Sequence, residues 1–101
     1  MEPRGHLDGM LLAILGAGPA HGYAIAQALK ERSGGVFDLP EGTIYPALHR
    51  LERAGMLRSE WASAGGRRRR VYQLTARGRR SLPGARRDWL RFSTAVEAVM
   101  G

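Results

Sequence analysis

Three stretches in the first half of the chain place apolar residues on one side of a helix. The spacing i, i+3, i+4, i+7 predicts a first helix of about ten residues that ends at Leu15, with Leu7, Met10, Leu11 and Ile14 on the same face. The same spacing predicts a second helix over about 21–32 and a third that ends at Ala54. Glycine-containing segments close all three, at Gly16, at 33–35 and at Gly55. We therefore expect three short helices that share one core.

The start of the third helix has two possible positions because of Pro46. A proline inside a helix removes a hydrogen bond and costs about 3 kcal/mol, whereas in the first turn its missing N–H is free. If Thr43 is the N-cap, Pro46 falls in the first turn. If the helix begins at Glu41, a local distortion is expected. The sequence leaves both starts open.

After Gly55 the pattern changes to that of strands. The segments 56–61 and 71–74 predict two strands, joined by Ala64-Gly65-Gly66 and a run of four arginines, and so a hairpin. Thr75 is placed to cap a further helix, which Pro83-Gly84 is expected to interrupt or restart. Beyond it, apolar residues repeat at intervals of three and four, as in a coiled-coil seam: Leu82, Ala85, Trp89, Phe92, Val96 and Val99.

This order of elements predicts a mainly α protein with a small β-hairpin. Three helices followed by a two-stranded wing are the parts of a winged helix-turn-helix domain, in which the third helix enters the major groove of DNA. We assign residues 1–80 to this DNA-binding domain and residues 81–101 to a C-terminal dimerisation helix. A domain of 101 residues buries a limited share of its surface, which favours self-association.

Charge is concentrated at one end of the chain. Residues 1–66 carry six basic and seven acidic side chains, whereas residues 67–101 carry ten arginines and two acids, within a net charge of +7. Such a block suits a polyanion, either nucleic acid or an anionic membrane surface. The simpler alternative is a solvated, arginine-rich surface. The lack of a long apolar run and of a signal-peptide pattern leads us to expect no membrane partner and a cytoplasmic location.

The DNA-binding candidates lie on the third helix and on the wing. Polar residues outside the apolar stripe of the third helix are candidates for base and phosphate contact: Thr43, His49, Arg50 and Arg53. Tyr45 either packs beneath the helix or bonds a phosphate. On the wing the candidates are Arg67, Arg68, Arg69 and Arg70, of which alternation along a strand brings two to the same face. The alternative for Arg50 and Arg53 is a solvated face paired with Glu52 and Glu31.

Enzyme chemistry finds no support in the sequence. Cysteine is absent, which excludes thiol nucleophiles and Cys-ligated zinc. The three histidines, His6, His21 and His49, have no partner at metal-ligand spacing, and no phosphate loop or nucleophile elbow is present. His21 fits a helix-start or packing residue better than a catalyst. We expect no enzyme activity, no metal and no cofactor.

Three separated motifs resemble the phenolic acid decarboxylase regulator (PadR) family of bacterial winged-helix transcriptional regulators, in its short form with one C-terminal helix. They are residues 18–23 (GPAHGY), 42–55 (GTIYPALHRLERAG) and 65–78, with GGR, RRVYQLT and Gly78. Pro40-Glu41 stands where members commonly have Ser-Pro. Arg68 stands where a proline is common, which makes this wing more basic and less stiff.

The resemblance implies a homodimeric repressor that binds a pseudo-palindromic operator in double-stranded DNA. It also implies release by a small hydrophobic or aromatic effector in a pocket at the dimer interface, near Trp89 and Phe92. Ordinary dimer core is the alternative for these two residues. The alternatives for the protein are a constitutive DNA-binding regulator without an inducer site and an RNA-associated basic protein. RNA modules usually display aromatic residues on an exposed sheet, whereas most aromatics here lie on helical positions suited to burial.

Overall fold

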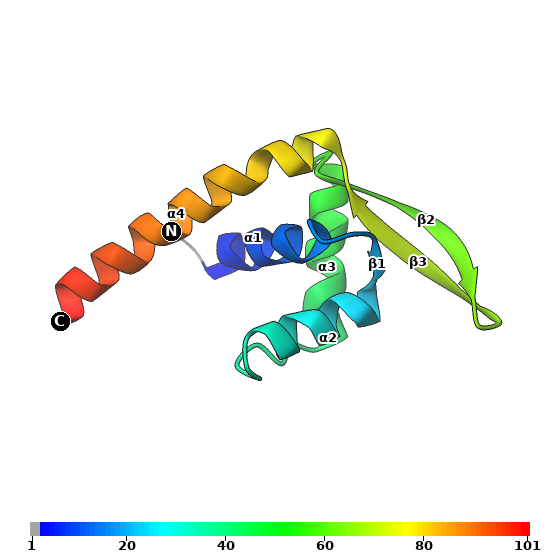
Figure 1. Cartoon of the computed structure of the whole chain (residues 1–101), viewed down its shortest axis with the longest axis horizontal. Coiled ribbons are helices and arrows are strands. Elements are labelled where there is room, and N and C mark those ends of the chain that lie inside the picture. Colours follow the sequence, from blue (N-terminus) through cyan, green and yellow to red (C-terminus); the bar gives the residue numbers. More distant parts are fainter. Residues whose placement is uncertain (1–2) are drawn as a thin grey trace.

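Residues 3–101, the part of the chain that the computed structural model describes, form four helices and one three-stranded antiparallel sheet (Figure 1). The helices are α1 (Pro3–Leu15), α2 (Gly22–Arg32), α3 (Glu41–Arg53) and α4 (Ala76–Met100). The strands are β1 (Ala20–His21), β2 (Leu57–Ala64) and β3 (Arg67–Leu74), in the order β1-β3-β2. The fold is the predicted winged helix-turn-helix followed by a C-terminal helix.

The core joins apolar side chains from α1, α2, α3 and the base of the hairpin. Burying each leucine-sized side chain contributes about 1.5–3 kcal/mol, so this cluster holds the three helices and the hairpin together. Within the described residues, α4 adds only the partly buried Leu82. The buried members are Leu11, Leu12, Ile14, Leu15, Ile25, Leu29, Ile44, Ala47, Leu48, Leu51, Leu57, Tyr72 and Leu74.

Helix α3 begins at Glu41, so the alternative start that takes Thr43 as the N-cap is wrong. Pro40 occupies the cap position with extended backbone, and its carbonyl accepts from the N–H groups of Thr43 (2.9 Å) and Ile44 (3.2 Å). Pro46 therefore lies inside the helix. Because Pro46 has no N–H, the carbonyl of Gly42 lacks its helical donor. Gly42 and Pro46 are both exposed, so water can hydrate that carbonyl.

Both strands of the hairpin are longer than predicted. Gly65 and Gly66 have φ angles of +57° and +77°, as a two-residue type I′ turn requires, and the strands run up to them on both sides. The arginine run 67–70 consequently lies within β3 and not in the turn. The two-residue strand β1 pairs with β3 and was not predicted, because so short a strand leaves no periodic pattern.

Helix α4 continues through Pro83, so the predicted interruption is wrong. The carbonyl of Arg79 loses its helical donor at this point. Arg79 and Pro83 are both exposed, and water can replace the missing bond. Helix α1 is likewise longer than expected, since it begins at Pro3, where a first-turn proline is well tolerated. The C-terminal half of α4 projects beyond the three-helix body (Figure 1).

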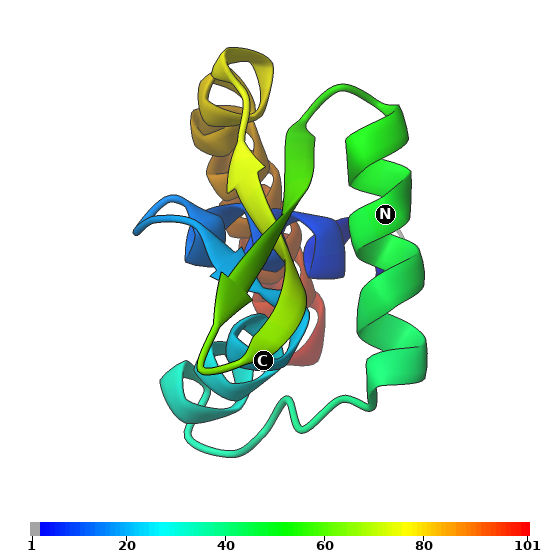
Figure 2. The ribbon, with the colours of Figure 1, turned by 90° about the vertical axis from the view of Figure 1, so that its right-hand side faces the viewer.

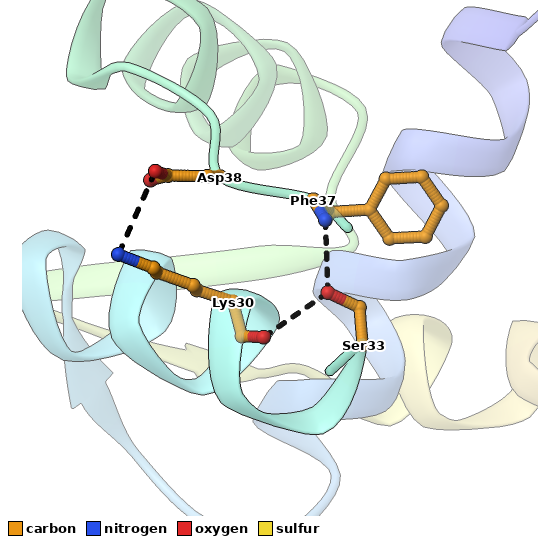
Figure 3. A network of polar contacts seen from close by, with 4 residues as sticks. All are labelled: Lys30, Ser33, Phe37 and Asp38. Carbon is orange, nitrogen blue, oxygen red and sulfur yellow. Dashed lines mark hydrogen bonds and ion pairs between the residues drawn. The ribbon is translucent and has the colours of Figure 1, made fainter. Parts of the chain in front are cut away.

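The connection from α2 to α3 is fixed by a small polar network (Figure 3). The Ser33 hydroxyl donates to the Lys30 carbonyl (3.1 Å) and accepts from the Phe37 N–H (2.9 Å). The Lys30 ammonium lies 3.5 Å from the Asp38 carboxylate. These contacts are exposed and individually weak, but together they restrict the loop that orients α3 against α2.

A tight corner joins the hairpin to α4. The Thr75 hydroxyl donates to the Gly55 carbonyl (2.6 Å) and accepts from the Gly78 N–H (3.0 Å), which makes Thr75 the N-cap of α4, as predicted. The Thr75 N–H donates to the carbonyl of Met56 (3.1 Å). Gly78 lies so close to that carbonyl that a Cβ on it would collide. The corner therefore requires a hydroxyl and a glycine three residues apart.

We predict that Gly78→Ala destabilises the protein by about 2 kcal/mol or more, because the added methyl forces the start of α4 away from Met56. Gly84→Ala, in the same helix, is the matched control. Its nearest neighbour is the flexible end of Arg87 at 3.8 Å, and it should gain a few tenths of a kcal/mol or more from helix propensity. Urea unfolding followed by circular dichroism at equal protein concentration measures both. Equal stability of the two variants would contradict the assignment of the corner.

Candidate nucleic-acid interface

Helix α3 and the hairpin border a cleft of about 570 Å³. Figure 2 looks toward the hairpin tip and shows α3 running beside the two strands. The cleft combines three arginines with two histidines, three aromatic residues and one acid. Its lining residues are His21, Tyr45, His49, Glu52, Trp61, Arg68, Arg69, Arg70 and Tyr72.

The predicted contact residues of α3 differ in exposure and in whether another side chain already binds them. Thr43, His49 and Arg53 are exposed. Arg50 is half-buried, and its guanidinium donates to the Asp8 carboxylate of α1 at 2.7 Å. Arg50 therefore ties α3 to α1, and its partner is neither Glu52 nor Glu31.

Tyr45 packs against the start of α2. A Cβ on Gly22 would collide with its ring and hydroxyl, so this glycine makes room for the tyrosine. The ring is half-buried, contacts the core and also lines the cleft. Of the two predicted roles, packing is the one that the structure displays, and the ring still forms part of the cleft wall.

The strand register separates the arginine run into two pairs. Arg70 lies opposite Trp61, and Arg68 lies opposite Ser63. Side chains alternate along β3, so Arg68 and Arg70 share the face of Tyr72, while Arg67 and Arg69 point to the other face. The expected alternation is thus present. Arg69 still reaches the cleft edge, where one guanidinium nitrogen lies 3.4 Å from Nδ1 of His21.

Arg70 is tied into a network that links the hairpin to α3. Its Nε donates to the Ser59 hydroxyl (2.8 Å), which donates to the Glu52 carboxylate (2.7 Å). The guanidinium of Arg70 lies 3.9 Å from the same carboxylate. Burial raises the pKa of the Tyr72 hydroxyl beneath this network, and Glu52 adds to that shift. Tyr72 is consequently a neutral part of the cleft.

The sequence reasoning missed two residues at this interface. The guanidinium groups of Arg68 and Arg70 lie over the ring of Trp61, with their central carbons 4.9 and 5.3 Å from the ring centroid. Extending the two predicted strands up to the glycine turn would have placed Trp61 opposite Arg70, so a signal existed. His21 caps α2, because its Nδ1 accepts from the Ala24 N–H at 3.2 Å. This contact agrees with the helix-start role expected of His21.

The residues predicted for the dimer seam fall into two groups along α4. Leu82 packs against the core and lies 3.6 Å from where a Cβ on Gly16 would be. Further along, Trp89 is 49% and Val99 87% exposed, whereas Phe92 and Val96 are partly covered. Leu90 and Met100 are exposed apolar residues that were not predicted.

An aromatic cluster joins α1 to α4. The imidazole of His6 lies 5.1 Å from the Trp89 ring in an edge-to-face arrangement and 4.9 Å from the Phe92 ring. Its Nε2 atom is buried and has no hydrogen-bond partner among the described residues. The sequence spacing argued against a metal-ligand role for His6 and gave no sign of this contact.

Two absences hold for residues 3–101. They contain no group of three or more metal-ligating His, Asp or Glu side chains. Their helices also lack the combination of length and apolar character that a membrane span requires.

Three helices, a basic hairpin beside the third and a long C-terminal helix define a winged helix-turn-helix regulator as the class of protein. The chain belongs to the PadR-like family of transcriptional regulators, whose model matches residues 11–83. This match confirms the resemblance inferred from the three sequence motifs.

Individual relatives agree with this assignment. Transcriptional regulator Rv3488 of Mycobacterium tuberculosis is 43% identical over 67 residues, which cover 66% of this chain and 60% of that protein. A PadR family transcription regulator from Clostridium difficile R20291 has a TM-score of 0.81 at 31% identity, covering 95% of this chain and 99% of that one. Bacillus subtilis PadR, solved in complex with operator DNA, has a TM-score of 0.69 at 29% identity, covering 83% and 45%. These relatives are regulators, in agreement with the expectation that the chain is not an enzyme.

We predict that the ion pair between Arg50 and Asp8 stabilises the fold by about 0.5–1 kcal/mol, as a half-exposed pair does. Unfolding free energies of Arg50→Ala, Asp8→Ala and the double variant give this coupling directly. Arg53→Ala, at an exposed position of the same helix, is the control and should leave stability unchanged. Additive losses of unfolding free energy at positions 50 and 8 would show that Arg50 does not hold α1. Arg50 would then again be a candidate for DNA contact.

Proposed function

We propose that the chain is a homodimeric transcriptional repressor that binds a pseudo-palindromic operator in double-stranded DNA. A small hydrophobic or aromatic effector releases it from that operator. The observation that carries this proposal is the exposed apolar side of α4. Its C-terminal half projects from the body on the side opposite the hairpin, while α3 and the hairpin line the basic cleft. We place this activity in the cytoplasm, where the DNA is.

In this proposal, α3 and the hairpin have different roles in DNA binding. The exposed Thr43, His49 and Arg53 on α3 are the side chains free to meet base edges or phosphates in a major groove. The hairpin arginines supply charge for the phosphate backbone. The related Bacillus subtilis PadR was solved in complex with operator DNA, which supports DNA binding by this fold. We assign residues 1–80 to DNA binding and residues 81–101 to dimerisation.

Dimerisation follows from the cost of leaving the end of α4 in water. Trp89 and Val99 are exposed on a helix that no other described element covers at its C-terminal end. Pairing with the same face of a second copy buries these side chains around a two-fold axis. Two α3 helices related by that axis require an operator with two-fold related half-sites.

The proposed effector site is the aromatic surface of α4 near the dimer axis. Trp89 is half-exposed, and its ring neighbours Phe92 at 6.2 Å, so a flat aromatic molecule has a face on which to stack. A constitutive regulator without an effector is the second candidate. It is favoured by the contacts that both rings already make with His6, which suit ordinary interface core.

We predict that duplexes selected from random DNA will contain two-fold related half-sites and will bind this protein as a dimer. Val99→Asp should give a monomer with much weaker operator binding, because it places a charge in the α4 seam. Thr94→Asp is the matched control, since Thr94 is exposed and lies about 140° around the same helix. Sedimentation and gel shift at ~150 mM salt measure both properties. Equal affinity for structured RNA, or half-sites without symmetry, would contradict the proposed function.

We further predict that some flat aromatic compounds release the selected operator and that Trp89→Ala abolishes this release. The reason is that the variant removes the stacking face near the dimer axis. Trp89→Phe keeps a smaller ring and should retain part of the response. Fluorescence anisotropy of labelled operator, titrated with each compound, measures release. Release that persists in a dimeric Trp89→Ala protein would place the sensor elsewhere, and absence of release by any compound would favour the constitutive alternative.

A further inference from the structure

Trp61 is a large aromatic side chain on the hairpin that the core does not use. It is 56% exposed, on the face of β2 that borders the cleft beside α3. Leaving so much apolar surface in water brings no gain in folding free energy.

The ring of Trp61 contacts two guanidinium groups. Arg68 and Arg70 lie over it with their central carbons 4.9 and 5.3 Å from the ring centroid. Stacking uses the flat face of a guanidinium and leaves the N–H donors at its edge available. A stacked arginine can thus be restricted in position and still bind a phosphate through two hydrogen bonds.

The two stacked arginines are not equivalent. Arg70 already donates to Ser59 and lies 3.9 Å from the Glu52 carboxylate. The guanidinium of Arg68 makes no hydrogen bond or ion pair within the described part of the chain, and its side chain is exposed. Arg70 is anchored to α3, whereas the donors of Arg68 remain available to a ligand.

We propose that Trp61 is a positioning residue that holds Arg68 at the mouth of the cleft, where it binds a phosphate of the DNA backbone. This inference rests on the proposed DNA-binding function and specifies how the hairpin takes part in it. Glu52 and Ser59 fix Arg70, and through it the Trp61 ring, to α3. The hairpin thereby presents Arg68 at a set distance from α3.

The charge of the cleft favours a phosphate as its occupant. Three arginines line it, and its one acid, Glu52, is engaged by Ser59 and Arg70. An arginine that is free to move loses rotamer freedom when it binds, and one already stacked on an aromatic ring loses less. Stacking should therefore improve affinity about five-fold without adding a contact to DNA.

The test compares substitutions that keep or remove the ring. Trp61→Ala and Trp61→Leu should each weaken binding to the selected operator about five-fold, and Trp61→Phe should restore most of the loss, because only an aromatic face stacks. Arg68→Ala should weaken binding and lower the slope of log K against log salt by about 0.9, as one lost phosphate contact does. Thermal unfolding of each variant checks that the hairpin remains folded.

Double variants test whether the tryptophan acts through the arginine. Trp61→Ala combined with Arg68→Ala should be no weaker than Arg68→Ala alone. Trp61→Ala combined with Arg67→Ala, on the opposite face of β3, should show additive losses. Additive losses at positions 61 and 68 would overturn the inference and indicate that Trp61 itself contacts DNA. Wild-type affinity in Trp61→Ala would also overturn it. Failure of the wild-type chain to bind any duplex would instead refute the proposed function.

Discussion

The hydroxyl of Thr75 sets the geometry on which the other parts of this protein depend. It bonds the Gly55 carbonyl at the end of α3 and the Gly78 N–H in the first turn of α4, next to the base of the hairpin. Three elements that would otherwise pivot about short connections are therefore fixed at one point. If α4 sets the distance between two copies, as we propose, this corner fixes where each α3 lies relative to the dimer axis.

The arginines of the chain divide between internal and external use, although the sequence does not distinguish them. Arg50 is bound to Asp8 and Arg70 to Ser59 and Glu52, so each stabilises the position of α3 or the hairpin. Arg53 and Arg68 are exposed beside them. Net charge alone would count all four equally for DNA affinity. The contacts of Arg50 and Arg70 leave Arg53 and Arg68 as the exposed cations of this set.

The fold could be predicted from the sequence to the extent that helix periodicity and turn residues specify it. The helical stripes ending at Leu15 and Ala54, the glycine turn at 65–66 and the Thr75 cap all gave the right element. The interruption predicted at Pro83 was wrong. The prediction included the cost of the lost hydrogen bond, but the sequence does not show that the carbonyl of Arg79 is exposed to water. The start of α3 stayed open for the same reason.

Long-range pairs limited the prediction of the site. The partner of Arg50 lies 42 residues away in α1, and the contact of His6 with Trp89 joins the two ends of the chain. Neither pair leaves a local pattern. Trp61 differs, because the register of a two-residue hairpin turn fixes which side chains face each other. Extending the predicted strands up to Gly65-Gly66 would have placed Trp61 opposite Arg70 from sequence alone.

The continuity of α4 through Pro83 bears on how an effector could act at a distance. About fifteen residues separate Thr75 from Trp89, which corresponds to roughly 20 Å of helix. A helix interrupted at Pro83 would absorb a change of packing at Trp89 within the break. An unbroken helix, fixed at Thr75, transmits the same change as a rotation of the whole winged domain. In the dimer that we propose, an operator accepts the two α3 helices only at a defined spacing, so a small rotation at the proposed dimer axis is sufficient to lower affinity.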